Sequence, residues 1–331
     1  MLRRYLPSVI THSQRKDVEI VVADNGSTDT SLEVLRMDFP SVRTIQLGSN
    51  YGFAGGYNKA IQQIDSDYTL LLNSDVEVTE GWLDTLLTYM DNHPQVAAVQ
   101  PKVLSWSSKK EHTVNPTRSI CFEHAGAAGG FIDVLGYPFC RGRMVDYVED
   151  DDGQYDSEAT IFWASGACMC VRTHVYREVG GLDDEFFAHM EEIDLCWRAK
   201  LAGHSVWAVP AASVYHLGGG PLDNASPRKL YLNYRNNLLM LYKNLPYNRR
   251  GGLIFTRKVV DGIAAVFYLI TGKWKYVGAV ASAHRDFRRM KGSLEPSAFS
   301  EDGNDIGHLR KSIIWLYIKS LGRLTFDKIR F

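Results

Sequence analysis

The sequence has no hydrophobic run long enough to span a membrane and few cysteines. The nearest approach, residues 262–271 (GIAAVFYLIT), is well short of the ~18 apolar residues that a transmembrane helix needs. The opening residues lead into an amphipathic pattern, not into the apolar core of a signal peptide. The five cysteines are an odd number without the C-x-x-C spacing of zinc sites, which predicts reduced thiols in a cytoplasmic protein.

The charge of the chain is balanced overall but unevenly distributed. Its 331 residues suggest about two domains, and its 45% hydrophobic and 23% charged residues are ordinary for a globular protein. The net charge is −1, yet residues 245–331 hold 16 Lys/Arg against 7 Asp/Glu, which gives +9 there and −10 elsewhere. A basic tail favours an anionic partner, for which a membrane surface or a nucleic acid would serve.

Hydrophobic periodicity predicts an α/β protein. Helical patterns alternate with expected strands at residues 18–23, 42–47, 70–72, 96–103, 161–171 and 206–215. This alternation is typical of a parallel sheet with helical crossovers. We expect a catalytic domain at 1–244, with a long ordered insertion at 105–160, and a basic, amphipathic helical region at 245–331.

The run of three leucines at 70–72 is the central stretch of this pattern. We expect a strand buried on both faces, followed at its carboxyl end by Asn73, Ser74 and Asp75. Ligands bind at that edge of an open α/β sheet, and a carboxylate there could hold a divalent metal against a phosphate. The alternative is that Asp75 caps a following helix.

Four motifs together carry a family resemblance. They are DNGSTD at 24–29, NYGFAGGYN at 50–58, NSD at 73–75 and EEIDLCWR at 191–198. With them the chain, up to about residue 245, resembles the family 2 glycosyltransferases with the GT-A fold, near the bacterial rhamnosyltransferase-like members. The resemblance implies a mostly parallel sheet flanked by helices. It also implies inverting, metal-dependent transfer from a dTDP- or UDP-sugar to a glycan or lipid-linked acceptor in surface polysaccharide synthesis, without a nucleic acid partner.

The resemblance assigns the donor nucleotide to the first three motifs. Its donor-binding residues are Asp24, Asn25, Gly52, Gly55, Asn58, Asn73, Ser74 and Asp75. Simpler structural roles stay open for several of them: an Asx-turn for the acid at 24, a tight turn for the glycines, and a packing role for Asn58.

The metal, Mg²⁺ or Mn²⁺, is assigned to Asp75 and His216. Asn73 stands where the family's D-x-D motif has its first carboxylate, so one full carboxylate remains. His216 matches the family's metal-ligating histidine, and the alternative is a structural histidine.

The base that deprotonates the acceptor is expected among Glu191, Glu192 and Asp194. Carboxylates at a helix start also interact favourably with the helix dipole, which is the alternative reading. The family motif makes Glu192 the base, with Asp194 and Arg198 ordering the helix.

For two further pairs of residues, the sequence allows either contact with a ligand or a purely structural role. Trp163 and Gly166 lie on the strand that the resemblance places beside the sugars, where the indole could stack on a ring or be core. Arg141 and Arg143 could reach a diphosphate or lie on the surface.

One expected element is absent. Members of the family begin with a strand that lies in the middle of the sheet, and here the first helix starts at Leu2. We expect roughly a dozen residues to be missing from the start, the length of one strand and a turn. Extension from an upstream start should then raise stability and nucleotide affinity.

The basic C-terminal helices predict a peripheral location at the inner face of the plasma membrane, lying on the bilayer rather than spanning it. The alternative is a helical subdomain packed on the catalytic body. Two other functions remain open: a nucleotidyltransferase, for which the sequence shows no basic phosphate-binding loop, and a non-catalytic nucleotide- or sugar-binding module.

Overall fold

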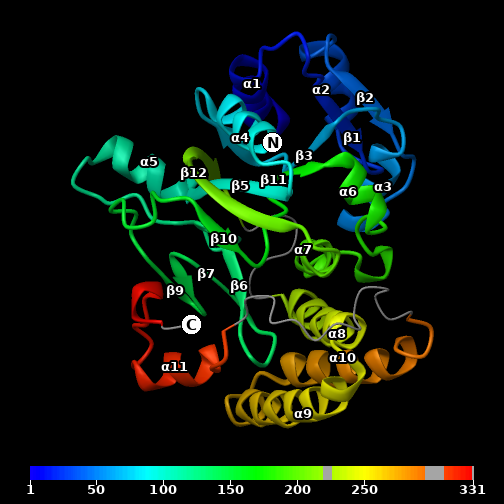
Figure 1. Cartoon of the computed structure of the whole chain (residues 1–331), viewed down its shortest axis with the longest axis vertical. Coiled ribbons are helices and arrows are strands. Elements are labelled where there is room, and N and C mark those ends of the chain that lie inside the picture. The colour runs from blue at the N-terminus through cyan, green and yellow to red at the C-terminus, as the bar shows by residue number, and fades with distance from the viewer. Residues whose placement is uncertain (219–225, 295–308, 330–331) are drawn as a thin grey trace.

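The computed structural model describes residues 1–218, 226–294 and 309–329 (Figure 1). The glycines at 219–220 and the linker expected at 295–304 lie outside the described residues. The first half alternates helices and strands as the periodicity predicts. Its elements are α1 (Leu2–His12), β1 (Val21–Asp24), α2 (Ser31–Asp38), β2 (Arg43–Gln46), α3 (Gly52–Ile61), β3 (Tyr68–Leu72), β4 (Val76–Val78), α4 (Trp82–Asn92) and β5 (Val96–Ser105).

The central sheet is mixed rather than wholly parallel. Its strand order is β10-β12-β5-β11-β3, and β4 pairs with β12. The remaining members are β10 (Ala159–Ile161), β11 (Cys168–Arg172) and β12 (Ser205–His216). Strand β12 runs parallel to β5, whereas β11 is antiparallel to both β3 and β5. The single strand expected over 161–171 is wrong, because a turn at residues 164–167 divides it.

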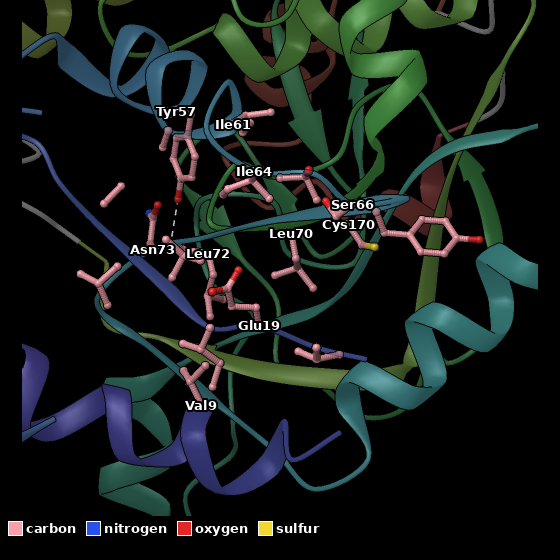
Figure 2. A pocket seen from close by; sticks show the side chains of 18 of the residues that line it. Val9, Glu19, Tyr57, Ile61, Ile64, Ser66, Leu70, Leu72, Asn73 and Cys170 are labelled. Atoms are coloured by element: carbon pink, nitrogen blue, oxygen red, sulfur yellow. Dashed lines mark hydrogen bonds between the residues drawn. The ribbon is translucent and has the colours of Figure 1, made fainter. Parts of the chain in front are cut away.

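Strands β1 and β2 form a separate parallel pair. Val21 and Val22 of β1 are only half-buried and Ala23 is exposed, although their sequence is that of a core strand. In β3, Leu71 is fully buried, while Leu70 and Leu72 are half-buried. The expectation of a leucine strand buried on both faces therefore holds for Leu71 alone, since a cavity lies beside the other two (Figure 2).

The insertion at 105–160 is ordered. It contains α5 (Trp106–Val114) and a four-stranded antiparallel sheet made of β6 (Gly130–Ile132), β7 (Pro138–Cys140), β8 (Arg143–Met144) and β9 (Tyr147–Val148). Arg141 and Arg143 are buried in it, and Arg141 donates hydrogen bonds to the carbonyls of Tyr155 and Ser157 at 3.2 and 3.0 Å. Neither arginine lies on the surface, and contact of either with a diphosphate stays a prediction.

The chain ends in helices that pack on the insertion and on the body. They are α6 (Thr173–Glu178), α7 (Glu191–Leu201), α8 (Pro227–Asn244), α9 (Tyr247–Ile270), α10 (Trp274–Met290) and α11 (Ile313–Lys319), with α8, α9 and α10 side by side at one end (Figure 1). Buried Arg257 of α9 donates to the Leu135 carbonyl at 2.8 Å. Among the described residues, no helix is long and apolar enough to cross a membrane.

Candidate functional site

Asp75 and His216 meet at the ends of two paired strands. The turn between β3 and β4 carries Asp75, and β4 pairs with the end of β12 so that Val76 lies opposite His216. His216 Nε2 is 3.2 Å from Asp75 Oδ1, and its Nδ1 is 3.3 Å from Glu123 Oε2. All three side chains are buried. The structure thus brings the two expected metal ligands together and adds a second carboxylate.

The two carboxylates keep this histidine charged. Burial disfavours the imidazolium, but the hydrogen bond to Asp75 and the contact with Glu123 outweigh it and raise the pKa of His216 to about 9. Burial alone would also raise the pKa of Glu123, yet His216 holds it below its usual value. Glu123 lies in the insertion, where no motif marks it, so sequence reasoning missed it.

These donors fit a metal only in part. Among residues 1–218, 226–294 and 309–329, no group of three His, Cys, Asp or Glu side chains is arranged to hold an ion. Asp75 and Glu123 lie at opposite nitrogens of one ring and cannot converge on one point. Asp75 Oδ1 and His216 Nε2 do face each other, which provides two protein ligands. Mg²⁺ commonly takes one or two carboxylates and completes its shell with substrate phosphates and water.

The glycine-rich loop is fastened to β1 by Asn25. Its side chain donates to the Gly52 carbonyl at 2.7 Å and accepts from the Tyr51 amide at 3.0 Å. Gly56 packs so closely that an added Cβ would lie 2.9 Å from Asn25 Nδ2. Asn25 therefore positions the loop, and Asp24, buried beside it, accepts from the Ser27 amide at 3.2 Å, a local bond within the turn.

The start of α3 is held by a backbone carbonyl. Phe187 O accepts the Phe53 amide at 2.6 Å. A Cβ on Gly52, whose φ is +73°, would lie 2.5 Å from the same carbonyl, so only glycine fits there. A Cβ on Gly55 would lie 3.0 Å from Tyr51 Cβ. These glycines therefore have a packing reason, and their contact with a donor stays a prediction.

Asn58 is occupied by protein partners. It donates to the Leu182 carbonyl at 2.7 Å and to Asp184 Oδ1 at 2.6 Å, and its carbonyl oxygen accepts from the Leu182 amide at 3.1 Å and from Tyr176. These bonds tie α3 to the segment before α7. The structure therefore supports the packing role that the sequence left open, and not the donor contact.

Glu191 and Glu192 begin α7 in an apolar environment. Burial raises the pKa of Glu192 to about 7, and burial together with Glu192 raises that of Glu191 well above its usual value. One carboxyl oxygen of each has no hydrogen-bond partner among the described residues. A carboxyl group that titrates near neutral pH and keeps a free oxygen is suited to accept a proton.

Asp194, the third acid of the motif, is not suited to accept a proton. Its carboxylate accepts from Arg198 at 2.8 Å and from Asn244 at 2.6 Å, and lies 3.1 Å from Lys243 Nζ. Although burial acts in the other direction, these partners lower its pKa. The structure thus supports the helix-ordering role for Asp194 and leaves it no free oxygen for a reaction.

The segment before α7 is strained and is held from α8. Phe187, His189 and Met190 have φ values of 64°, 71° and 76°, in a region that residues with a Cβ rarely adopt. Buried Asn236 donates to the carbonyls of Phe186, Ala188 and His189 at 2.7–2.9 Å. Sequence reasoning missed Asn236 because nothing marks it among the many polar residues of α8.

Trp163 belongs to the core. It is 4% exposed and donates from Nε1 to the Phe131 carbonyl at 2.9 Å, and a Cβ on Gly130 would lie 2.0 Å from its ring. The structure therefore supports the core role that the sequence left open, because protein covers the ring face.

Gly166 joins the two halves of the site. A Cβ there would lie 3.0 Å from the Phe53 ring and 3.7 Å from Glu192 Cβ. The next residue, Ala167, accepts the Asn73 amide at 3.0 Å. Asn73 and Glu192 therefore lie on either side of one short turn, and Ser74 beside Asn73 is exposed. The separate motifs converge on one region, at the ends of the sheet strands.

Comparison with known proteins points in one direction. Residues 1–150 match the family model described as glycosyl transferase family 2. An N-acetylglucosaminyl-diphospho-decaprenol L-rhamnosyltransferase of Mycobacterium tuberculosis (strain CDC 1551 / Oshkosh) is 29% identical over 226 residues, which are 65% of this chain and 71% of the relative. The rhamnosyltransferase WbbL of Escherichia coli (strain K12) is 27% identical over 210 residues, covering 60% of this chain and 72% of WbbL.

The fold has solved counterparts. The crystal structure of GalNAc-T7 with UDP, GalNAc and Mn²⁺ superposes with a TM-score of 0.54 at 17% identity. The match covers 73% of this chain and 45% of that one, and it shows a shared fold.

Proposed function

We propose that this chain, whose residues 1–150 match the family 2 glycosyltransferases, moves a rhamnose-type sugar from a dTDP- or UDP-linked donor to a hydroxyl of a lipid-linked glycan, with inversion. The acceptor class comes from the decaprenol-linked substrate in the name of the mycobacterial relative, and the sugar from both rhamnosyltransferases.

The observation that carries the proposal is the state of Glu192. Inverting transfer needs a base that takes the acceptor proton while the acceptor oxygen attacks the anomeric carbon. Glu192 has a pKa raised to about 7 by burial, an oxygen without a partner and a position across the Gly166 turn from Asn73. Glu191 is more deeply buried and would stay protonated, which leaves Glu192 as the carboxylate.

The surrounding residues orient this base. Asn236 fixes the strained carbonyls before α7, while Asp194 anchors the helix to α8 through Asn244. The Phe53 ring packs against Gly166, where an added Cβ would lie 3.0 Å from the ring and 3.7 Å from Glu192 Cβ. An acceptor hydroxyl bound beside Glu192 would donate its proton to that carboxylate and attack the sugar from the face opposite the leaving diphosphate.

The metal would be held by Asp75 and by His216, whose ring would release its extra proton on binding the ion, together with the donor diphosphate. A bound Mn²⁺ or Mg²⁺ would supply positive charge to the leaving diphosphate. Asn73 would contribute a neutral amide in place of a second carboxylate. Asp75→Asn should therefore abolish the Mn²⁺-dependent part of nucleotide binding, with the matched exposed variant Asp152→Asn unchanged in a titration with and without Mn²⁺.

The C-terminal helices would hold the enzyme at a membrane, and residues 245–331 would form that region beside a catalytic domain at 1–244. One side of α9 exposes a stripe of apolar side chains: Phe255, Val259, Ile263, Val266, Phe267 and Ile270, each between 49% and 79% exposed. Lys273 and Lys275 follow directly. An apolar stripe with a basic flank suits a helix that lies on anionic lipid, and it supports a peripheral location at the inner face of the plasma membrane.

A direct assay tests the proposal. The purified chain, Mn²⁺ and membrane extract containing lipid-linked acceptors are incubated with radiolabelled dTDP-rhamnose, UDP-GlcNAc or UDP-glucose. Label from dTDP-rhamnose should enter the organic phase, with release of the nucleoside diphosphate. Nucleotide binding without turnover on any donor would instead support the binding-module alternative.

A further inference from the structure

A small cavity lies between the helices α9 and α10, which run side by side at one end of the molecule (Figure 1). Its volume is about 350 Å³, and it is lined by Lys258 of α9 and by His284 and Arg288 of α10. Cavities that hold small ligands measure about 300–1,000 Å³, so this one suits a small group. All three lining side chains can carry a positive charge, which favours an anion.

The basic residues of α10 share one face of the helix. His284, Arg288 and Lys291 are spaced i, i+4 and i+7, which places them in a row. Lys258 approaches this row from α9, since its Nζ lies 5.9 Å from the centre of the Phe287 ring. Burial lowers the pKa of Lys258, and the positive charges of Lys291 and Arg288 lower it further. Four basic side chains from two helices therefore gather at the cavity.

Acids of the protein do not balance these charges. In the described part of the chain, no carboxylate forms an ion pair with Lys258, Arg288 or Lys291. The one acid of α10, Asp286, lies on another side of the helix, where it accepts from the Tyr231 hydroxyl of α8 at 2.9 Å. Like charges at this spacing repel one another. An anion in the cavity would relieve that repulsion.

A buried carboxylate holds the histidine of the cavity in place. His284 Nε2 lies 3.1 Å from Oδ2 of Asp261, which is fully buried. Asp261 also accepts from the Tyr137 hydroxyl at 3.2 Å and lies 3.5 Å from Arg257, so its charge is used within the helix packing. No protein group among the described residues bonds the other ring nitrogen, Nδ1, which leaves it for a ligand.

The cavity borders the apolar stripe of α9. Phe255 precedes Lys258 by three residues and Gly262 follows it by four, so both are its neighbours on the helix surface. Phe255 is 69% exposed, and a Cβ on Gly262 would meet no atom within 4 Å. A ligand with an anionic head and an apolar chain could therefore place its head in the cavity and its chain along the stripe.

We propose that this cavity is a binding site for the phosphate group of an anionic lipid, whose acyl chain lies beside Phe255. A phosphate presents several acceptor oxygens, so it can accept hydrogen bonds from Arg288 and Lys258 at once. The volume admits one phosphate with a small adjoining group, and not the run of linked phosphates of a nucleic acid. The lining residues lie on other elements than Glu192 and Asp75, so the inference does not depend on the glycosyltransferase proposal.

The test uses the full chain and a soluble lipid, dihexanoyl phosphatidic acid, which stays monomeric in water. Calorimetric titration should show saturable one-to-one binding. Dihexanoyl phosphatidylcholine, which has the same chains, should bind at least about tenfold more weakly, because its choline would meet basic side chains. Inorganic phosphate should also bind more weakly, because it lacks the chain. Equal binding of the two lipids, or no binding of phosphatidic acid, would overturn the proposal. Inorganic phosphate bound as tightly as the lipid would contradict a lipid ligand.

Variants locate the site. The double variant Lys258→Gln/Arg288→Gln should weaken binding of dihexanoyl phosphatidic acid at least about tenfold, because it removes two charge-assisted hydrogen bonds. Lys275→Gln/Arg289→Gln is the matched control. It removes the same charge from exposed positions, and Arg289 lies 3.9 Å from Asp286, outside the cavity lining. The control should bind as the parent protein does. Equal weakening in both double variants would show a general attraction to positive charge and contradict the proposal.

Two features of the design keep its outcome separate from other effects. The comparison of the two lipids uses the unmodified chain, so a folding defect in a variant does not remove the test. The lipids form no bilayer at the concentrations used, so failure here and failure of the membrane contact of α9 are distinguishable. Glu192→Gln should bind dihexanoyl phosphatidic acid with unchanged affinity. Loss of binding in that variant would place the lipid in the transfer site and overturn the proposal.

Discussion

At the scale of single residues, three acids of one motif differ in the direction in which their pKa values shift. Asp194 lies beside the positive charges of Arg198 and Lys243 and accepts a hydrogen bond from Asn244. These contacts stabilise its carboxylate and lower its pKa. Glu191 and Glu192 lack such partners, and burial raises their pKa values. The same motif thus contains a structural carboxylate and a candidate base, and the environment alone distinguishes them.

The raised pKa of Glu192 predicts a pH profile. The base is active as a carboxylate, so kcat/KM should rise with pH up to about 7 and fall about tenfold per unit well below it. Rates at saturating donor, measured from pH 5 to 9, check this. Glu185→Gln, at an exposed position on the preceding turn, should leave the profile unmoved. A rate independent of pH between 5 and 8 would contradict the assignment.

The same shift carries a cost in stability. The folded protein holds the Glu192 proton up to about pH 7, while the unfolded chain releases it near 4.5. Folding is therefore favoured less as pH rises through that window. Glu192→Gln removes the titration, so it should raise Tm relative to the parent protein at pH 8 but not at pH 4. An equal change of Tm at both pH values would argue against a buried, titrating Glu192.

The sequence predicted several of these residues well. Motif positions identified Asp75 and His216 as a pair before any distance was known, and Glu192 as the base remains a prediction. Glu123 and Asn236 could not be found, because Glu123 acts on the distant His216 and Asn236 acts on carbonyls 47 to 50 residues before it in the chain. Trp163 was open between core and sugar, and only the packing of Gly130 on its ring decides for the core.

At the scale of elements, α8 holds the site in shape. Asn236 donates hydrogen bonds to carbonyls of the strained segment before α7, and it is fully buried. Its loss would leave buried carbonyls without a donor, at about 1–3 kcal/mol each. The sequence did not predict this role, because helical periodicity identifies an apolar face and not the partner of a polar side chain.

Asn236→Ala should therefore lower the free energy of unfolding by about 2–3 kcal/mol. It should also reduce kcat, because the segment that orients Glu192 would relax. Urea denaturation and steady-state rates measure the two effects. Asn233→Ala on the same helix is the matched control. Wild-type stability and rate in Asn236→Ala would show that the segment holds its strained conformation without this amide.

At the scale of the whole molecule, the fold class and the order of elements followed from periodicity. The family match and the named relatives favour glycosyl transfer over the nucleotidyltransferase alternative. The direction of the strands could not be predicted from the sequence, because an apolar run such as 161–171 does not reveal the turn at which the chain reverses.

The exposed stripe of α9 predicts membrane binding. Ile263 and Phe267, 66% and 60% exposed, would insert below the lipid headgroups. Each buried side chain contributes about 1.5–3 kcal/mol, so replacing both with Asp should weaken binding to vesicles with anionic lipid at least about tenfold. Flotation with the parent protein and with Val114→Asp provides the comparison. Unchanged flotation of the double variant would remove α9 from the membrane contact.

The central claim is that Glu192 takes the proton of the acceptor. The most direct measurement compares Glu192→Gln with the parent protein for sugar transfer to the lipid-linked acceptor and for donor binding with Mn²⁺. We predict a loss of transfer of about 10²–10⁴-fold with unchanged donor affinity. Glu185→Gln should keep both. Near-normal transfer by Glu192→Gln would contradict the account and move the base to another residue, with Glu191 the first to be examined.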